Sequence, residues 1–238
     1  IFNMVGGKQL PTAFAPRLVS NVYRADKHII FDTQTEVFHT YDPSNGLFTP
    51  KTHDDIREEL AALTFELGVA LSEGADETEA AIIANVANKA TTSGALNGHM
   101  AALKSSTSGN FDGENVGVVH CLSGFIDIKT GANRGRSPQY KSRNMAPFVY
   151  RKDAGCPRFL NELLAPALPD QGDIDTLQMV VGQMILGENR SQNILVLYGT
   201  AGSGKGVIVS IIQMLVGANN WMQLRTRHLG GRFEKYPM

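Results

Sequence analysis

ILVLYGTAGSGKGVIVSIIQMLVG, residues 194 to 217, joins an apolar run, a glycine-rich turn and a second apolar run of a different period. The run from 194 to 198 does not alternate, which is typical of a strand buried on both faces, as in a parallel sheet. Residues 205–217 have helical periodicity and end at Gly217, a suitable C-cap. The stretch therefore predicts a strand, a loop and a helix in succession, the context that a phosphate-binding loop requires.

The loop itself has the composition of a phosphate-binding loop. Glycines allow successive backbone N–H groups to point inward at phosphate oxygens, and the helix N-terminus adds its dipole. Lys205 puts a positive charge near the outer phosphates. We therefore predict a nucleotide site here, the alternative being a glycine-rich turn that binds nothing. The residues assigned to the site are Gly199, Thr200, Ala201, Gly202, Ser203, Gly204, Lys205, Gly206 and Val207.

Gly206 departs from the usual pattern of such loops. Most have Ser or Thr here, and the hydroxyl binds Mg²⁺. Adenylate-kinase-type loops have a similar Gly-Lys-Gly run, so the departure is compatible with a nucleotide site. Mg²⁺ could be held through water or by groups elsewhere; Ser203 and Ser210 are nearby hydroxyls, and Ser210 is expected to lie too far away. The metal ligand therefore stays unassigned.

The composition of the whole chain sets broad limits. With 238 residues, 42% of them hydrophobic and 19% charged, the chain can form one or two globular domains. The net charge of −1 gives no overall electrostatic case for nucleic acid, so that case depends on local patches. No apolar run reaches membrane-spanning length, so no membrane partner is expected. The chain begins with Ile1 rather than Met, which we interpret as the mark of a fragment or a processed chain.

The pattern along the chain predicts a mixed α+β region followed by a helical one. An antiparallel meander is expected within residues 28–52, and two short strands within 116–131. Helices are expected over 52–71, 77–90 and 95–104, and later over 156–164 and 174–186. We place a domain boundary near residue 155, which gives an accessory domain at 1–155 and the start of a nucleotide-binding domain at 156–238.

A basic segment runs from residue 134 to residue 152 and contains no acidic residue. Aromatic residues are interleaved with its cations, so the segment could follow a DNA backbone while the aromatic rings stack on bases. The alternative, favoured for any single residue, is a solvated irregular connector whose aromatic residues pack on the core. The candidate DNA-binding residues are Arg134, Arg136, Lys141, Arg143, Arg151 and Lys152.

Several blocks of the chain resemble, in order, those of the phage and plasmid primase-helicase family, a poxvirus/phage-type family whose motor is a superfamily 3 helicase. The resemblance covers most of the chain and is most specific from about residue 116. An N-terminal accessory domain precedes the motor in this family, and residues 29–50 are similar to it. The blocks are SGFIDIKTG (123–131), RSPQYKSRNMAPFVYRKDAGCPRFLNELL (136–164), LQMVVGQMILGENRSQNILVLYGTAGSGKG (177–206) and LRTRHLGGRFE (224–234).

The resemblance implies a fold and an activity. The fold class is then α/β: a mixed α+β accessory domain followed by the first part of a P-loop NTPase domain, AAA+-like, with a parallel sheet. The implied activity is ATP-driven unwinding of single-stranded or forked DNA, with ATP and Mg²⁺ as cofactors. Lys205 would be the catalytic residue that stabilises charge on the β and γ phosphates. The family works as a homo-oligomeric ring, usually a hexamer, in the cytoplasm of a bacterial host cell.

Other parts of the family's site follow the Walker A loop, namely the Walker B acids, a polar sensor and an arginine finger. Glu234 is the only acidic residue that follows the loop here. We therefore expect a chain truncated after Walker A that hydrolyses ATP poorly or not at all by itself. Two alternatives stay open. One is a non-catalytic DNA- or protein-docking module with a vestigial nucleotide loop. The other is a small-molecule kinase, which the late position of the loop disfavours.

Overall fold

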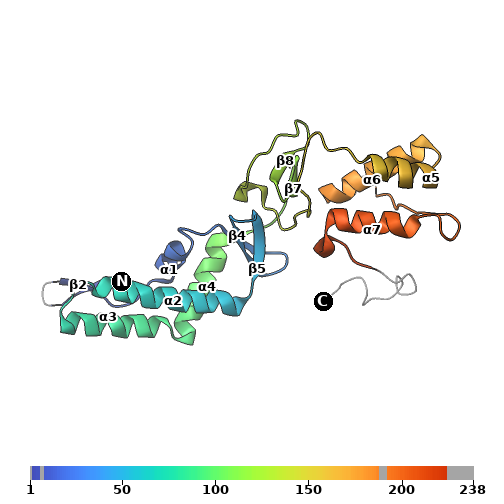
Figure 1. The fold of residues 1–238 in the computed structure, drawn as a ribbon. Coiled ribbons are helices and arrows are strands. Elements are labelled where there is room, and N and C mark those ends of the chain that lie inside the picture. Colours follow the sequence, from blue (N-terminus) through green and yellow to red (C-terminus); the bar gives the residue numbers. More distant parts are fainter. Residues whose placement is uncertain (1, 6–7, 188–191, 224–238) are drawn as a thin grey trace, which may run out of the picture. The chain divides into compact units, whose positions relative to one another are not determined.

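The computed structural model describes residues 2–5, 8–187 and 192–223, and the chain divides into two compact units (Figure 1). The N-terminal unit is Ile1–Gly113 and the C-terminal unit is Glu114–Met238. The boundary expected near residue 155 does not coincide with this division. The reason is that the segment before residue 155 bonds to later parts of the chain, as where Asn220 Nδ2 donates to the Met145 carbonyl at 3.4 Å.

Strands of the N-terminal unit form a hairpin and a four-stranded sheet. The meander expected within 28–52 is confirmed: β3, β4 and β5 pair antiparallel in that order. A short strand, β6, joins β3 in parallel, so the order is β5-β4-β3-β6. The bounds are β1 Phe2–Val5, β2 Lys8–Pro11, β3 Ile29–Asp32, β4 Val37–Asp42, β5 Leu47–Lys51 and β6 Ser108–Gly109.

Four helices complete this unit, and three of them were predicted: α2 and α3 to within one residue at each end, and α4 as a shorter helix than the one observed. Thr52 and Asp76 begin α2 and α3 with reciprocal capping boxes, which explains why both starts were legible in the sequence. The helices enclose a core that includes Val19, Phe38 and Leu60. The bounds are α1 Pro16–Tyr23, α2 His53–Ser72, α3 Glu77–Ala90 and α4 Ser93–Thr107.

The C-terminal unit begins with an antiparallel pair, β7 and β8, which confirms the two strands expected within 116–131. Its small core contains Cys121, Ile126 and Ala146, with Phe148 and Tyr150 packed against it. The bounds are β7 Val118–Cys121, β8 Gly124–Asp127 and the 3₁₀ turn η1 Pro138–Tyr140.

Helices make up the remainder of the described C-terminal unit. The predicted helices over 156–164, 174–186 and 205–217 are confirmed, the first partly as π-helix. Leu164, Leu177 and Ile208 form their shared core. The bounds are η2 Phe159–Leu164, α5 Ala165–Ala167, α6 Gln171–Leu186, α7 Lys205–Val216 and η3 Ala218–Asn220. No helix in the described ranges is long and apolar enough to cross a membrane.

The predicted buried strand at 194–198 is wrong. Leu195 and Leu197 pack against the helical core, but Ile194, Val196 and Tyr198 are 88%, 77% and 99% exposed. The run alternates between partly buried and exposed residues because only one of its faces packs against the helical core. No strand within 114–187 or 192–223 pairs with it. The expected parallel sheet of a P-loop domain is likewise not found there, since β7 and β8 are antiparallel. The chain is a mixed α and β protein.

Candidate nucleotide site

The glycine-rich loop leads directly into α7, with Lys205 as the first residue of the helix. Gly202 and Gly204 have φ angles of +80° and +83°, a left-handed conformation that glycine adopts without steric cost. Gly204 is the N-cap, and a Cβ added there would lie 3.6 Å from Cδ1 of Leu163. The loop is therefore bent tightly and rests against η2, as a chain reversal between an extended segment and a helix requires.

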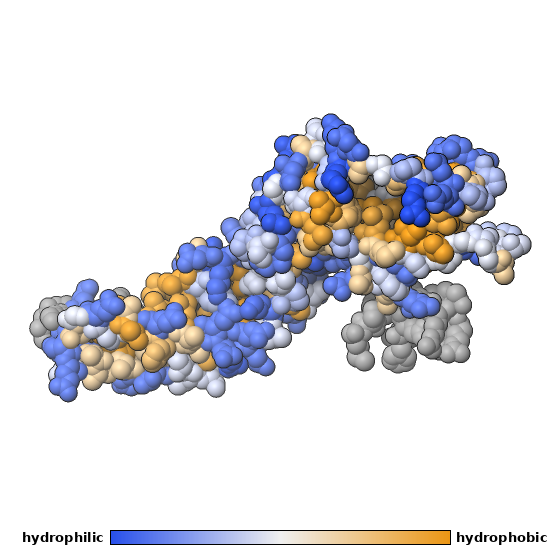
Figure 2. Space-filling view, viewed as in Figure 1, coloured by the Kyte–Doolittle hydropathy of each residue, from blue (hydrophilic) through white to orange (hydrophobic). Residues whose placement is uncertain are grey.

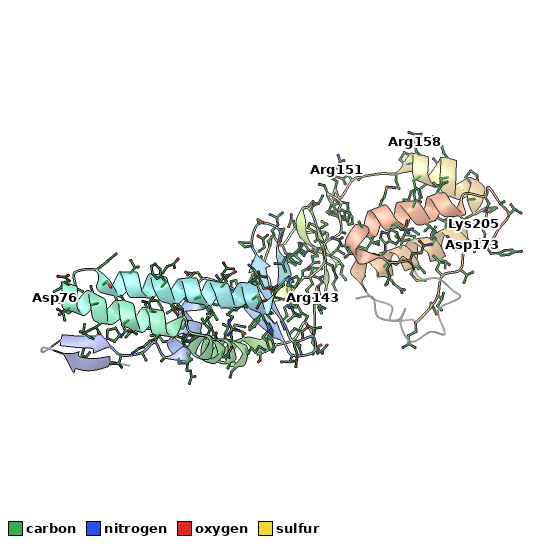
Figure 3. All side chains as sticks on the ribbon, turned by 90° about the horizontal axis from the view of Figure 1, so that it is seen from below. Asp76, Arg143, Arg151, Arg158, Asp173 and Lys205 are labelled. Carbon is green, nitrogen blue, oxygen red and sulfur yellow. The ribbon has the colours of Figure 1, made fainter. Side chains whose placement is uncertain are left out.

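Lys205 turns its ammonium group back over this loop. Its Nζ donates to the carbonyl oxygens of Gly199 and Thr200, at 2.9 and 2.8 Å, and to Oγ of Ser203 at 3.0 Å. Figure 3 shows Lys205 at the loop end of α7. The ammonium group is thus held against the turn at a helix N-terminus, where the dipole also favours an anion. The arrangement can accept a phosphate group if Nζ exchanges carbonyl oxygens for phosphate oxygens.

Packing of α7 fixes where the helix presents Lys205. Ile208, one turn further along, is buried with Leu164 and Leu177 of the neighbouring helices. Val207 is about half exposed, as expected for the outer end of the assigned site. The C-terminus of α7 is capped at Gly217, whose φ is +94°. The predicted helix and its end are therefore confirmed, and the helix holds the loop on a packed support.

The residues present do not fit a magnesium ion. Gly206 has no side chain, and Oγ of Ser210 donates back to the Gly206 carbonyl at 2.9 Å, within the helix. Oγ of Ser203 accepts from Lys205. In the described part of the chain, no group of three His, Cys, Asp or Glu residues could hold a metal ion. No protein ligand for Mg²⁺ is therefore assigned, and no chemical step is derived through the ion.

The basic segment is only partly available to DNA. Arg134 pairs with Asp127 at 2.8 Å, and this bond, the first among several, holds the pKa of Asp127 well below its usual range. Arg143 donates hydrogen bonds from Nε and Nη2 to Oε2 of Glu114, at 3.0 and 2.9 Å. Arg136 donates to the Leu122 carbonyl at 3.3 Å. Two of the six candidate cations thus already have a carboxylate partner.

The remaining candidates differ from one another. Arg151 and Lys152 are exposed, and the structure gives neither an ion pair with any described residue; Figure 3 labels Arg151 on the connector between β8 and η2. Lys141 lies in a left-handed turn with φ of +49° and is partly buried. Arg151 and Lys152 are therefore the candidates best placed to meet a phosphate backbone.

Aromatic residues of the basic segment pack inward. Tyr140 stacks on Phe125 with ring centroids 4.4 Å apart, and Phe125 in turn stacks on His120 at 4.0 Å. Phe148 and Tyr150 pack against the small core beside β7 and β8. The rings therefore have the structural role that the sequence left open as an alternative to stacking on bases.

A cavity that the sequence analysis did not predict lies in the C-terminal unit. It has a volume of about 750 Å³, and His120, Asn144, Met184 and Trp221 are among its lining residues. It adjoins the C-terminal ends of α6 and α7. A helix of this length spans roughly 18 Å, so the cavity is separate from the loop at the other end of α7. Its lining residues are too scattered in the chain for any sequence motif to reveal them.

Other predictions lie outside the described residues. One of them is the resembling block at 224–234, which contains the basic residues Arg225, Arg227, His228 and Arg232. Comparison with known proteins adds no relative: no protein-family model matches the chain, and no curated protein matches it.

Proposed function

We propose that residues 199–207 bind the phosphates of ATP, and that the chain is part of an ATP-dependent DNA helicase motor. The observation that carries the nucleotide proposal is the position of Lys205 Nζ, bonded to two loop carbonyls and a hydroxyl at the start of α7. The ammonium group now bonds to uncharged oxygens, and exchanging them for phosphate oxygens adds the attraction between opposite charges to each hydrogen bond.

Other residues of the site would act through the backbone. Gly206 and Val207 lie in the first turn of α7, where N–H groups have no partner within the helix and can donate to phosphate oxygens. The left-handed glycines let the loop curl around the phosphates. In this proposal Lys205 stabilises negative charge on the β and γ phosphates, which is the catalytic role the family resemblance implies.

Support for a DNA motor comes from the resembling blocks at 123–131, 136–164 and 177–206 together with two exposed cations. Arg151 and Lys152 lie on the connector between the β7–β8 pair and the helices that support the loop. Cations in that position could track a phosphate backbone while the loop holds ATP. In this proposal the motor works as a homo-oligomeric ring in the parent protein.

Calorimetric titration of ATP into the chain tests the nucleotide proposal. Lys205→Ala removes the ammonium group and is expected to weaken ATP binding about tenfold or more, the size of one charge-assisted contact. Lys129→Ala is the matched control, because Lys129 is an exposed lysine of the same unit on the turn after β8. Equal ATP affinity in the wild type, Lys205→Ala and Lys129→Ala would refute the proposal.

A second candidate function is favoured by the absence of a hydroxyl at Gly206. In that case the chain is a DNA- or protein-docking module whose loop holds a nucleotide without turning it over. Binding of a fluorescent single-stranded oligonucleotide, with and without ATP, separates the two. The motor proposal expects ATP to change DNA affinity and Lys205→Ala to remove that change, whereas the docking module expects neither.

A further inference from the structure

The start of α7 offers no side chain to a metal ion at the position where phosphate-binding loops usually hold Mg²⁺. Gly206 is the second residue of the helix, and a Cβ added there would meet no heavy atom within 4 Å. Its backbone is not in the left-handed region, so larger residues would fit. Crowding and backbone strain therefore do not explain the glycine, and the missing hydroxyl is a property of the phosphate site itself.

Neighbouring hydroxyl groups do not replace the missing one. Ser210 lies one turn further along α7, where its Oγ donates to the Gly206 carbonyl at 2.9 Å. Oγ of Ser203 accepts from Lys205 Nζ at 3.0 Å and so belongs to the cation's own set of acceptors. Thr200 meets the same ammonium group through its backbone carbonyl, and its side chain is exposed. The positive charge at the loop thus comes from Lys205 and the helix dipole.

From this arrangement we propose that the loop binds a nucleoside triphosphate as the metal-free anion. The inference rests on the proposed nucleotide site and names the form of the ligand that this site takes. Mg²⁺ bound to the phosphates lowers the negative charge that Lys205 attracts. Because the described residues offer no ligand for the ion, none of them compensates for that loss. ATP therefore binds at least as tightly without Mg²⁺ as with it.

Calorimetric titration of ATP in MgCl₂ and in EDTA, at matched ionic strength, tests this inference on the whole chain. The wild type is expected to bind ATP in EDTA within about twofold of its affinity in MgCl₂, or more tightly. Gly206→Thr supplies the hydroxyl and is expected to shift the ratio of the two affinities about tenfold in favour of MgCl₂. Gly206→Ala, which adds a side chain without a hydroxyl, is the matched control and is expected to keep the wild-type ratio.

Two further variants ask whether a neighbouring hydroxyl recruits the ion when ATP is bound. Ser203→Ala and Thr200→Val are expected to keep the wild-type ratio of affinities in EDTA and MgCl₂. ATP binding by the wild type that weakens about tenfold or more in EDTA would overturn the inference and leave the nucleotide site standing. No ATP binding in either buffer would overturn the proposed nucleotide site and the inference with it.

Discussion

The two units differ in how completely their helices and strands cover one another. In the N-terminal unit, Val19, Phe38, Ile56, Leu60 and Leu103 are fully buried between a sheet and four helices. In the helical part of the C-terminal unit, the extended run at 194–198 keeps one apolar face open, and Figure 2 shows a broad hydrophobic area over α6 and α7. The core of the N-terminal unit is covered on all sides. In this part of the C-terminal unit, the core covers only one side of the run at 194–198.

This difference indicates where a substitution should change stability. Removing a side chain from a closed core leaves an empty cavity. Removing one from a half-covered segment leaves a surface depression that water can fill. The single tryptophan, Trp221, belongs to the C-terminal unit, so its fluorescence reports unfolding there. Far-UV circular dichroism follows both units, and comparison of the two signals separates their transitions.

The largest expected effect comes from truncating the closed core. Leu60→Ala should lower the free energy of unfolding of the N-terminal unit by about 2–5 kcal/mol, the usual cost of a leucine-sized cavity. Leu197→Ala, the same change in the partly buried extended run, should lower that of the C-terminal unit by only about 1 kcal/mol. Urea denaturation followed by both signals measures the two. Similar losses would show that the contrast between the units is wrong.

A close helix contact gives the next largest effect. A Cβ on Gly68 of α2 would lie 2.6 Å from Cβ of Ala87 on α3, nearer than such atoms approach. Gly68→Ala should therefore force the helices apart and cost about 1–3 kcal/mol of unfolding free energy. Gly94→Ala in α4 is the control, because a Cβ there meets nothing within 4 Å. This control should be neutral or stabilising by up to about 1 kcal/mol. Urea denaturation of both variants measures the difference, and equal stabilities would contradict the expected clash.

How far the sequence could predict these features depends on whether the signal is local. The starts of α2 and α3 were predictable because Thr52 and Asp76 cap them through residues three positions away. Burial of 194–198 was not predictable, since it depends on which segments lie on both sides of the run. A continuous apolar run looks the same in a covered and a half-covered setting.

The candidate site divides in the same way. The glycines, the lysine and the start of the helix could be recognised within about ten residues of sequence. The structure brings them together as one turn. The sequence could not show which carboxylates pair with the cations of the basic segment. Arg143 bonds to Glu114, which lies 29 residues earlier in the chain, and Arg134 forms an ion pair with Asp127, which lies before the segment begins. Clustered cations in a sequence therefore overstate the charge that is available at the surface.

A smaller effect concerns the pH dependence of the N-terminal unit. Glu59 accepts hydrogen bonds from Tyr23, Lys27 and Lys51. These partners outweigh the opposing effect of burial and lower the pKa of Glu59 to about 2. A lowered pKa means that the stabilisation is fully present above the unfolded value and is lost as pH falls from about 4.5 towards 2.

Glu59→Gln tests whether the negative charge of Glu59 stabilises the N-terminal unit. The variant should lose on the order of 1 kcal/mol of unfolding free energy at neutral pH, after allowance for solvent screening of a partly exposed group. Its stability should also fall less steeply than that of the wild type between about pH 4.5 and 2. Glu66→Gln, an exposed change on the same helix, is the control. Urea denaturation across this pH range measures both, and parallel profiles for the wild type and Glu59→Gln would contradict the role of Glu59.

The smallest expected effect is on DNA binding, and it contrasts paired with unpaired cations within the C-terminal unit. Arg151→Ala and Lys152→Ala each remove an exposed charge without an ion partner in the described residues, so each should reduce the slope of log affinity against log salt by about 1. Arg134→Ala should change that slope less, because Asp127 already neutralises Arg134. Fluorescence anisotropy of a labelled single-stranded oligonucleotide over a salt series measures all three. An equal drop for Arg134→Ala would mean that DNA displaces Asp127, and the ion pair would then be a competitor for the phosphate backbone rather than a fixed structural link.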